Sequence, residues 1–344
     1  MLNVSIAVVI FIISFILTWC LRIYALKNNV IDVPNQRSSH SVPTPRGGGV
    51  AIVVSFLIGL FALSMLGLIS TFQLFSLSIA GSVTAIVGFL DDHGHIAARW
   101  RLLMHFLVGA AGLYFLGQFP IIEFFGYEFS AGWAGMLFGL IYLVWMLNLY
   151  NFMDGINGLA SIEAITFSFG SCVLLIYTVP GAMETSQFAI LVLLGCAALG
   201  FVFWNFPKAK IFMGDAGSGF LGIIIGLIVL HIATLNSVLF MAEICLLGVF
   251  IVDATVTLLR RIIAGKKVYE AHASHTYQIL ARKYGNHIPV TLGALLINIV
   301  WLTPLSLLIA KGVITGVVGV FIAWLPLVVL AFLCGAGVKD KANS

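Results

Sequence analysis

The chain has 344 residues, of which 61% are hydrophobic and only 9% are charged, and its formal net charge is +4. Soluble domains carry about 25% charged residues, so this composition excludes a soluble globular protein. The apolar runs are long and unbroken, which also excludes a membrane β-barrel, whose strands alternate between apolar and polar residues.

A helix needs roughly 20 apolar residues to cross a bilayer, and eleven windows of this kind follow one another along the chain. They lie near residues 2–21, 47–69, 72–90, 102–119, 131–148, 158–179, 188–204, 218–235, 238–259, 288–310 and 312–334. We therefore predict an all-α, polytopic membrane protein with about eleven transmembrane helices in one domain, 1–344. The first window lacks a charged start and is too long for a signal peptide, so we expect it to be the first helix.

Charge predicts the orientation of this bundle. With eleven spans, sixteen of the seventeen lysines and arginines fall in loops on one side, and only Lys311 falls on the other. Positive residues gather on the cytoplasmic side of a membrane protein. We therefore expect the N-terminus outside and the C-terminus in the cytoplasm.

Carboxylates from three separate loops lie on this same side. Asp91 and Asp92 end the third window, Asp154 follows the fifth, and Asp215 precedes the eighth. A transporter places its polar site near the midplane on broken helices, so this gathering at one face favours an enzyme that takes one substrate from the cytoplasm and another from the membrane. We expect its active site to be built from five loops, near 22–46, 90–101, 148–158, 205–217 and 260–287.

Two motifs suggest a cation and a phosphate. Asp91 and Asp92 adjoin in "GFLDDHGHIAARWR", and neighbouring carboxylates repel each other unless a cation or proton lies beside them. Asp215 stands among glycines in "IFMGDAGSGFLG", where backbone N–H groups at a helix start can face an anion. A carboxylate beside an anion site suggests Mg²⁺, which takes one or two carboxylates plus phosphate oxygens.

The stretch "NLYNFMDGINGLA", residues 148–160, interrupts apolar sequence with Asn148, Asn151, Asp154 and Asn157. On a helix the first three share one broad face. Amides both donate and accept hydrogen bonds, which suits a nucleobase or a sugar. A capping or turn role explains one or two of these residues but not the whole set.

Two further loops carry candidate ligand contacts. His272 and His275 lie in "AHASHTYQ", where phosphate or sugar contact is a better interpretation than a zinc site, since no further ligands complete one. Arg37 and Arg46 lie in "RSSHSVPTPRGGGVAI" and can bind phosphate, although the positive charge of cytoplasmic loops alone also predicts arginine there.

Taken in order, these motifs resemble the polyprenyl-phosphate N-acetylhexosamine-1-phosphate transferases, also called glycosyltransferase family 4. The resemblance covers roughly residues 34–280 and includes "PTPRGGG", "GFLDD", "NLYNFMDGINGLA", "FMGDAGS", "DATVTLLRR" and "HASHTYQ". The eleventh window exceeds the ten of the cell-wall branch and is similar to the O-antigen and teichoic-acid initiating branch.

This resemblance implies that a UDP-N-acetyl-sugar and undecaprenyl phosphate react at the cytoplasmic face of the bacterial inner membrane, giving an undecaprenyl-diphosphate sugar and UMP. It implies Mg²⁺, or Mn²⁺, as cofactor, no nucleic-acid partner, and a possible homodimer. Direct attack by the lipid phosphate and a covalent aspartyl intermediate both stay open.

The resemblance also implies roles for single residues. Asp215 and Asn151 match metal or diphosphate contacts, Asp91 and Asp92 match the pair that deprotonates or orients the lipid phosphate, and Asn157 falls where the family contacts uracil. His275 matches the first histidine of the family's histidine-rich loop, near the sugar and diphosphate.

Two positions depart from the family. Many relatives carry Asp at position 157, and many carry a basic residue where this chain has Ala273 and Ser274. The histidine pattern is most similar to transferases that use UDP-FucNAc, UDP-QuiNAc or UDP-GlcNAc.

Two alternatives to this transferase function are a transporter of a nucleotide-sugar or lipid-linked sugar, and an enzyme like the CDP-alcohol phosphotransferases. The latter enzymes need Asp-Gly where this chain has Asp92–His93.

Overall fold

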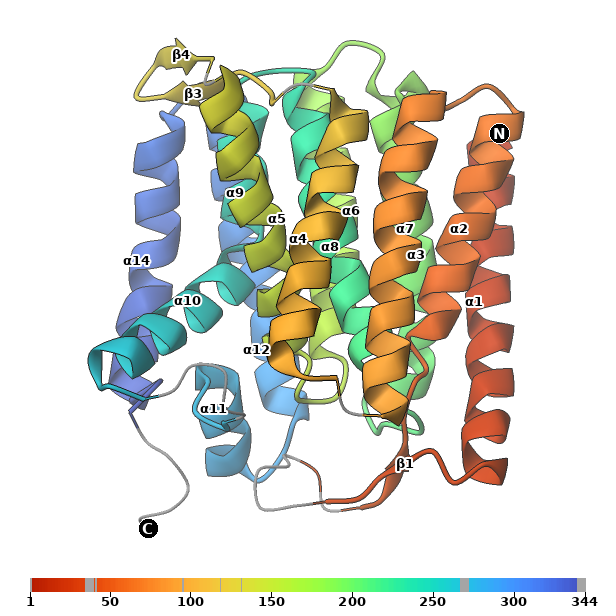
Figure 1. The fold of residues 1–344 in the computed structure, drawn as a ribbon. Coiled ribbons are helices and arrows are strands. Elements are labelled where there is room, and N and C mark those ends of the chain that lie inside the picture. The colour runs from red at the N-terminus through yellow and green to blue at the C-terminus, as the bar shows by residue number, and fades with distance from the viewer. Residues whose placement is uncertain are drawn as a thin grey trace.

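The computed structural model describes residues 2–34, 40, 42–94, 96–117, 119–130, 132–266 and 272–338. The described part of the chain is mostly helical, as predicted, and its helices pack side by side into a bundle (Figure 1). The long helices of its first two thirds are α1 (Leu2–Lys27), α2 (Val50–Met65), α3 (Thr71–His93), α4 (Ala98–Leu116), α5 (Gly132–Met153), α6 (Leu159–Thr178), α7 (Ser186–Asn205) and α8 (Asp215–Ala233).

The last third is more broken. Its elements are α9 (Leu239–Leu246), α10 (Gly248–Ile263), α11 (Thr276–Tyr284), α12 (Ile288–Ile297), the π-helix η2 (Asn298–Leu302), α13 (Thr303–Ala310) and α14 (Gly316–Cys334). Short connecting elements complete the described chain: the strands β1 (Ile31–Asp32), β2 (Thr44–Pro45), β3 (Ile122–Phe124) and β4 (Tyr127–Phe129), and the 3₁₀ helix η1 (Ala182–Glu184).

Among the described residues, eight helices are long and apolar enough to cross a membrane, or nine when α9 and α10 count as one span. Each of the eleven predicted windows coincides with a helix or a broken pair. However, α2 has only 16 residues, fewer than a straight crossing needs. A polytopic membrane protein is therefore confirmed, whereas the count of eleven and the orientation stay predictions. Figure 1 shows α1 beginning, and α14 ending, at opposite ends of the bundle.

Helix α8 forms the centre of the bundle. All its residues from Ala216 to Ala233 are buried, and its neighbours include α3 and α5. A helix that is apolar all round is buried on every side. Because α8 begins at Asp215, this central helix delivers one candidate site residue to one end of the bundle.

The window 238–259 is not one straight helix. Helix α9 ends at Leu246, and α10 leaves it at an angle of 74°. Gly248 at the break lies against the ring of Trp324, where a β-carbon would be 2.8 Å from the indole nitrogen. As a result α10 runs obliquely across the bundle toward α11 (Figure 1).

The window 288–310 is also irregular, because it contains the π-helix η2. Pro304 follows this turn and lacks the N–H that would continue an α-helical ladder. The hydroxyl of Thr303 donates to the carbonyl oxygen of Asn298 over 2.7 Å and satisfies one acceptor there.

Two antiparallel hairpins were not predicted. In the first, Ile31 pairs with Pro45 and Asp32 pairs with Thr44. This hairpin continues into the start of α8, since Phe212 donates its N–H to the carbonyl of Pro45 and Gly48 donates to the carbonyl of Phe212. The hairpin therefore holds the 44–49 segment beside Asp215. The second hairpin joins β3 to β4 at the opposite end of the bundle (Figure 1).

Candidate active site

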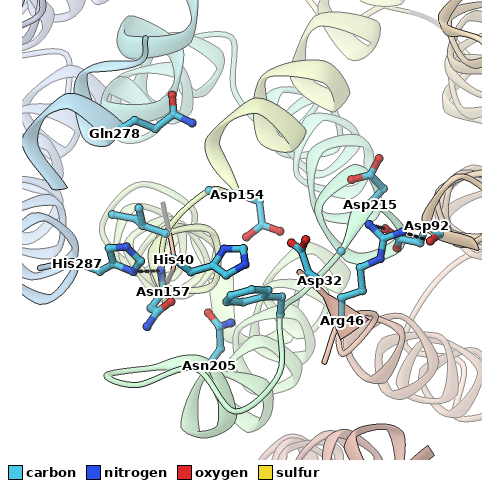
Figure 2. A pocket seen from close by; sticks show the side chains of 14 residues that line it. Asp32, His40, Arg46, Asp92, Asp154, Asn157, Asn205, Asp215, Gln278 and His287 are labelled. Atoms are coloured by element: carbon cyan, nitrogen blue, oxygen red, sulfur yellow. Dashed lines mark hydrogen bonds and ion pairs between the residues drawn. The ribbon is translucent and has the colours of Figure 1, made fainter. Parts of the chain in front are cut away.

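A polar cavity of about 220 Å³ lies where the first hairpin, α3, α8 and the turn between α5 and α6 meet. Among the residues that line it are five predicted site residues: Arg46, Asp92, Asp154, Asn157 and Asp215. Figure 2 shows Asp154 between two groups, with Arg46, Asp92 and Asp215 on one side and His40, Asn157 and His287 on the other. The structure therefore brings carboxylates from three separate segments of the chain to one cavity.

A narrower cavity of about 30 Å³ adjoins the first, and Asp215 lines both. Three predicted residues lie here: Asp91, Asn148 and Asn151. The Asn151 amide donates to the Ser218 hydroxyl over 3.2 Å, and the Asn148 amide donates to the carbonyl of Val144 over 2.7 Å. Asn151 thus reaches from the last turn of α5 to the start of α8, whereas Asn148 bonds back to its own helix and lies 3.3 Å from Nδ1 of His105 in α4.

Glycines make this convergence possible. A β-carbon on Gly88 would lie 2.5 Å from the carbonyl oxygen of Asp215, so the end of α3 packs directly on the start of α8. Gly214 has φ +78°, a conformation that favours glycine, and a β-carbon there would lie 2.6 Å from Oδ2 of Asp92. Larger residues at 88 or 214 would separate the carboxylates.

The adjacent aspartates have different partners. Asp91 accepts a hydrogen bond from the N–H of Ile96 over 2.7 Å and pairs with Arg101. Asp92 is paired with Arg46, whose guanidinium contacts both its backbone carbonyl and its Oδ1, the latter at 3.7 Å. Only Asp92 faces the larger cavity. The two adjacent carboxylates therefore lie in different surroundings.

Two arginines lie among these acids. Besides pairing with Asp91, Arg101 reaches Oδ2 of Asp215 at 3.5 Å and so bridges α3, α4 and α8. Arg46 pairs with Asp92. Sequence reasoning treated Arg101 only as part of the positive charge of cytoplasmic loops. Arg101 lies ten residues after Asp91, on the next helix, so local sequence spacing does not predict the contact between them.

Negative charge is concentrated around Asp154. Burial, together with the neighbouring carboxylates of Asp215 and Asp92, raises the pKa of Asp154 to about 8. Oδ2 of Asp92 is buried and has no hydrogen-bond partner within the described part of the chain. Buried carboxylates grouped in this way are chemically suited to bind a cation through their oxygens.

No three histidine, cysteine or acidic side chains of the described residues are grouped closely enough to hold a metal ion by themselves. A Mg²⁺ site needs only one or two carboxylates from the protein, because water and substrate phosphates complete its shell. The donor set of Asp215, Asn151 and the unpartnered oxygen of Asp92 therefore suits a hard cation that arrives with a phosphorylated ligand.

The other end of the larger cavity is aromatic and amide-rich. The ring of His40 meets the ring of Phe212 edge-on at 4.8 Å between centroids. Asn157 donates its amide to the carbonyl of Pro207 over 3.2 Å, and Asn205 accepts the N–H of Gly158 over 2.6 Å. These contacts fix the turn after α5 against the end of α7.

The predicted histidines do not line this cavity. The side chain of His275 is 4% exposed, stacks between His272 and Tyr277, and lies 3.6 Å from Asp253. The direct ligand contacts predicted for His272 and His275 therefore stay predictions. Arg37 lies outside the described residues.

Several lining residues have no role assigned from the sequence: Asp32, His40, Asn205, Phe212, Gln278 and His287. Asn205 ends an apolar window, which is a signal that could have found it. His40 and His287 are single histidines about 250 residues apart, and only the fold brings them to one cavity.

Comparison with known proteins identifies sequences that are similar to this chain. The sequence model described as "Glycosyl transferase family 4" matches residues 74–233. A "probable undecaprenyl-phosphate N-acetylglucosaminyl 1-phosphate transferase" of Bacillus subtilis is 29% identical over 285 residues, covering 79% of this chain and 76% of that protein.

Two further relatives extend the comparison. An "undecaprenyl-phosphate alpha-N-acetylglucosaminyl 1-phosphate transferase" of Thermotoga maritima is 28% identical over 279 residues, covering 80% of each chain. A "phospho-N-acetylmuramoyl-pentapeptide-transferase" of Streptococcus pyogenes is 34% identical over 247 residues, covering 63% of this chain and 68% of that protein. The range matched by the family model, residues 74–233, includes Asp91, Asp92, Asp154 and Asp215.

Proposed function

Because the chain belongs to glycosyltransferase family 4, the polyprenyl-phosphate N-acetylhexosamine-1-phosphate transferases, we propose that it transfers an N-acetylhexosamine-1-phosphate group from a UDP-sugar to undecaprenyl phosphate. An oxygen of the lipid phosphate forms a new bond to the β-phosphorus of the UDP-sugar. The bond from that phosphorus to the bridging oxygen breaks, and UMP leaves. The products are UMP and an undecaprenyl-diphosphate sugar.

One observation carries the proposal: Asp92, Asp154 and Asp215 face one cavity at the same end of the bundle, with Asp92 keeping a buried, unpartnered oxygen. Phosphoryl transfer depends on positioning and charge neutralisation more than on covalent chemistry by the protein. Three carboxylates repel a diphosphate unless a cation lies between them, so this cavity suits a donor that binds together with Mg²⁺ or Mn²⁺.

We assign Asp215, Asn151 and Asp92 as the residues that would hold the cation. When bound, Mg²⁺ would neutralise charge on the diphosphate and polarise its phosphoryl oxygens. Arg101 holds Asp215 and Asp91 in place through its two contacts. Arg46 holds Asp92, and its side chain is 35% exposed, so it remains open to a phosphate as well.

The cavity has a polarity that matches a nucleoside diphosphate sugar. The Phe212 and His40 rings, with the amide of Asn157, form one end and suit a planar base, whose π-face stacks on aromatic side chains. The acids form the other end and suit the diphosphate and its cation. The lipid phosphate is already mostly ionised near pH 7, because its second pKa is about 6. Asp91 and Asp92 therefore act mainly by orienting it.

The donor remains one of UDP-GlcNAc, UDP-FucNAc and UDP-QuiNAc in this proposal. The printed names of the relatives from Bacillus subtilis and Thermotoga maritima favour N-acetylglucosamine. We place the product at the start of O-antigen or related cell-surface glycan synthesis. We also propose eleven spans in the bacterial inner membrane, with the cavity on the cytoplasmic face and a homodimer as the assembly.

Mass spectrometry of the lipid products tests this proposal. Purified protein would be incubated with undecaprenyl phosphate, Mg²⁺ and one UDP-sugar at a time. We expect an undecaprenyl-diphosphate N-acetylhexosamine from one donor, and none without the lipid phosphate. Free sugar in place of a lipid-linked product would indicate a hydrolase and contradict the proposal.

A further inference from the structure

The beginning of α11 is tied to α10 by one carboxylate that has no assigned role. Oδ1 of Asp253 accepts the backbone N–H of Thr276 over 2.8 Å, and Oδ2 accepts the N–H of Tyr277 over 3.0 Å. These are two of the N–H groups that a helix start leaves without a partner. Asp253 is buried, so losing this acceptor would leave buried donors unsatisfied.

The Asp253 carboxylate also contacts the side chains of Thr257 and His275. The hydroxyl of Thr257 donates to Oδ1 of Asp253 over 3.1 Å, and Nδ1 of His275 lies 3.6 Å from that oxygen. His275 is the residue before α11, and its N–H donates to the side chain of Gln278, which lines the larger cavity. Asp253 therefore fixes the first turn of α11 through contacts with Thr276, Tyr277 and His275.

Tyr277 extends this chain of contacts to the active-site turn. Its hydroxyl donates to the carbonyl of Phe152 over 2.9 Å. Burial, with the nearby Asp253 and Asp154 carboxylates, keeps the pKa of Tyr277 well above its usual range, so the hydroxyl stays a donor. Phe152 lies two residues before Asp154, at the end of α5.

The contact leaves no space beside the turn. A β-carbon on Gly155 would lie 2.1 Å from the Tyr277 hydroxyl oxygen, 3.0 Å from Cζ and 3.1 Å from Cε2. Gly155 lines the larger cavity between Asp154 and Ile156. The position of the Tyr277 hydroxyl therefore determines where the backbone that carries Asp154 can run.

We propose that Asp253 and Tyr277 are positioning residues of the donor site: Asp253 fixes the first turn of α11, and Tyr277 uses that turn to hold the Phe152–Gly155 backbone in place. This inference rests on the proposed function for its substrate, the UDP-sugar, but its packing can be tested without any turnover. Neither residue touches the reacting atoms. Both act on Asp154 through the backbone.

The kinetic test compares Tyr277→Phe and Asp253→Asn with the wild type, using UDP-sugar and lipid phosphate as varied substrates. We expect each variant to raise the KM for the UDP-sugar about three- to tenfold, the effect of one hydrogen bond, and to leave the KM for the lipid within twofold. Tyr284→Phe is the matched control, because this tyrosine of the same helix is 58% exposed.

The split between the two KM values distinguishes positioning from a loss of fold. A purely structural role would lower the folded fraction, and with it the apparent kcat, while both KM values stayed unchanged. That outcome would overturn the proposal. A rise in both KM values by the same factor would also overturn it, because the effect would not be confined to the donor site.

A steric test needs no activity. Gly155→Ala should lower the melting temperature through its collision with the Tyr277 hydroxyl, and adding Tyr277→Phe should restore part of the loss, since that variant removes the atom at 2.1 Å. Gly293→Ala, where a β-carbon meets nothing within 4 Å, is the control and should not lower the melting temperature, because alanine is the better helix former within α12. A double variant no more stable than Gly155→Ala would overturn the packing on which the proposal rests.

UDP binding by calorimetry separates this inference from the proposed function. If the wild type binds UDP but shows no transfer with any donor, the proposed function fails. In that case a higher Kd for UDP in Tyr277→Phe and Asp253→Asn would still support the positioning role. An unchanged Kd in both variants would overturn it.

Discussion

Gly88 of α3 packs directly on the backbone of Asp215 at the start of α8, and a β-carbon at position 88 would lie 2.5 Å from the Asp215 carbonyl. This contact sets the distance between the aspartates that end α3 and the aspartate that begins α8. The separation of the site's carboxylates is therefore determined by helix packing rather than by loops.

Gly88→Ala should accordingly reduce transfer without unfolding the protein. The added methyl group pushes α3 away from α8, and a displacement of about 1 Å at a reacting centre can cost about a hundredfold in rate. Turnover measured on protein that elutes as a single species checks this prediction. Gly293→Ala is the control, since its β-carbon meets nothing within 4 Å. Full activity of Gly88→Ala would contradict the importance of this contact.

Arg101→Lys should also lower turnover. The guanidinium contacts Asp91 and Asp215 together, whereas an ammonium group is a point charge that does not present the same fork of donors. We expect a loss of at least about tenfold in kcat. Arg99→Lys is the control, because the Arg99 guanidinium lies over the ring of Trp100, 5.7 Å from its centroid. Equal kcat for both variants would show that the bridge by Arg101 is dispensable.

Asp215→Asn should abolish transfer and weaken binding of the cation. The variant keeps the shape of the side chain but removes its charge, and losing one electrostatic contact to a transition state costs about a hundredfold or more. Mn²⁺ binding, followed by electron paramagnetic resonance in the presence of UDP, checks the cation directly. Unchanged Mn²⁺ affinity in this variant would contradict the assignment of Asp215 as a ligand.

The raised pKa of Asp154 predicts a dependence of stability on pH. The pKa of this carboxyl is about 8 in the folded protein, against an ordinary value of 3.8. Between these values the folded state binds the proton that the unfolded state has lost. The free energy of unfolding therefore falls as pH rises from about 4 to 8, and this loss is complete above pH 8.

Melting temperatures in the absence of divalent cations check this sign. Asp154→Asn cannot ionise, so it should become more stable relative to the wild type as the pH is raised from 5 to 8. Mg²⁺ with UDP should reduce the difference at pH 8, because a cation favours the ionised carboxylate. A difference that shrinks with rising pH would contradict the buried environment of Asp154.

Much of this arrangement could be predicted from the sequence. Asp92, Asp154 and Asp215 each lie where an apolar window ends or begins on one side, and the alternation of windows alone places them at one end of the bundle. The break between α9 and α10 could not be predicted, because the apolar run is continuous there. At this break Gly248 packs against Trp324, a residue far away in the sequence.

The histidines that line the cavity could not be identified from the sequence. The pattern of His272 and His275 suggests ligand contacts. In the structure, however, Asp253 accepts the N–H of Thr276 at the start of α11, and the neighbouring His275 is buried beside the same carboxylate. His40 and His287 line the cavity instead, and each stands in a loop without a periodic pattern around it. Side chains that reach a site through tertiary contacts leave no signal in local spacing.

UMP release by the purified wild-type protein is the most direct measurement. The assay would contain undecaprenyl phosphate and Mg²⁺, with UDP-GlcNAc, UDP-FucNAc and UDP-QuiNAc supplied in turn. We predict UMP release from one of these donors that requires the lipid and that Asp215→Asn abolishes. No lipid-dependent UMP from any donor, in an assay where a relative such as the Thermotoga maritima transferase is active, would contradict the proposed reaction.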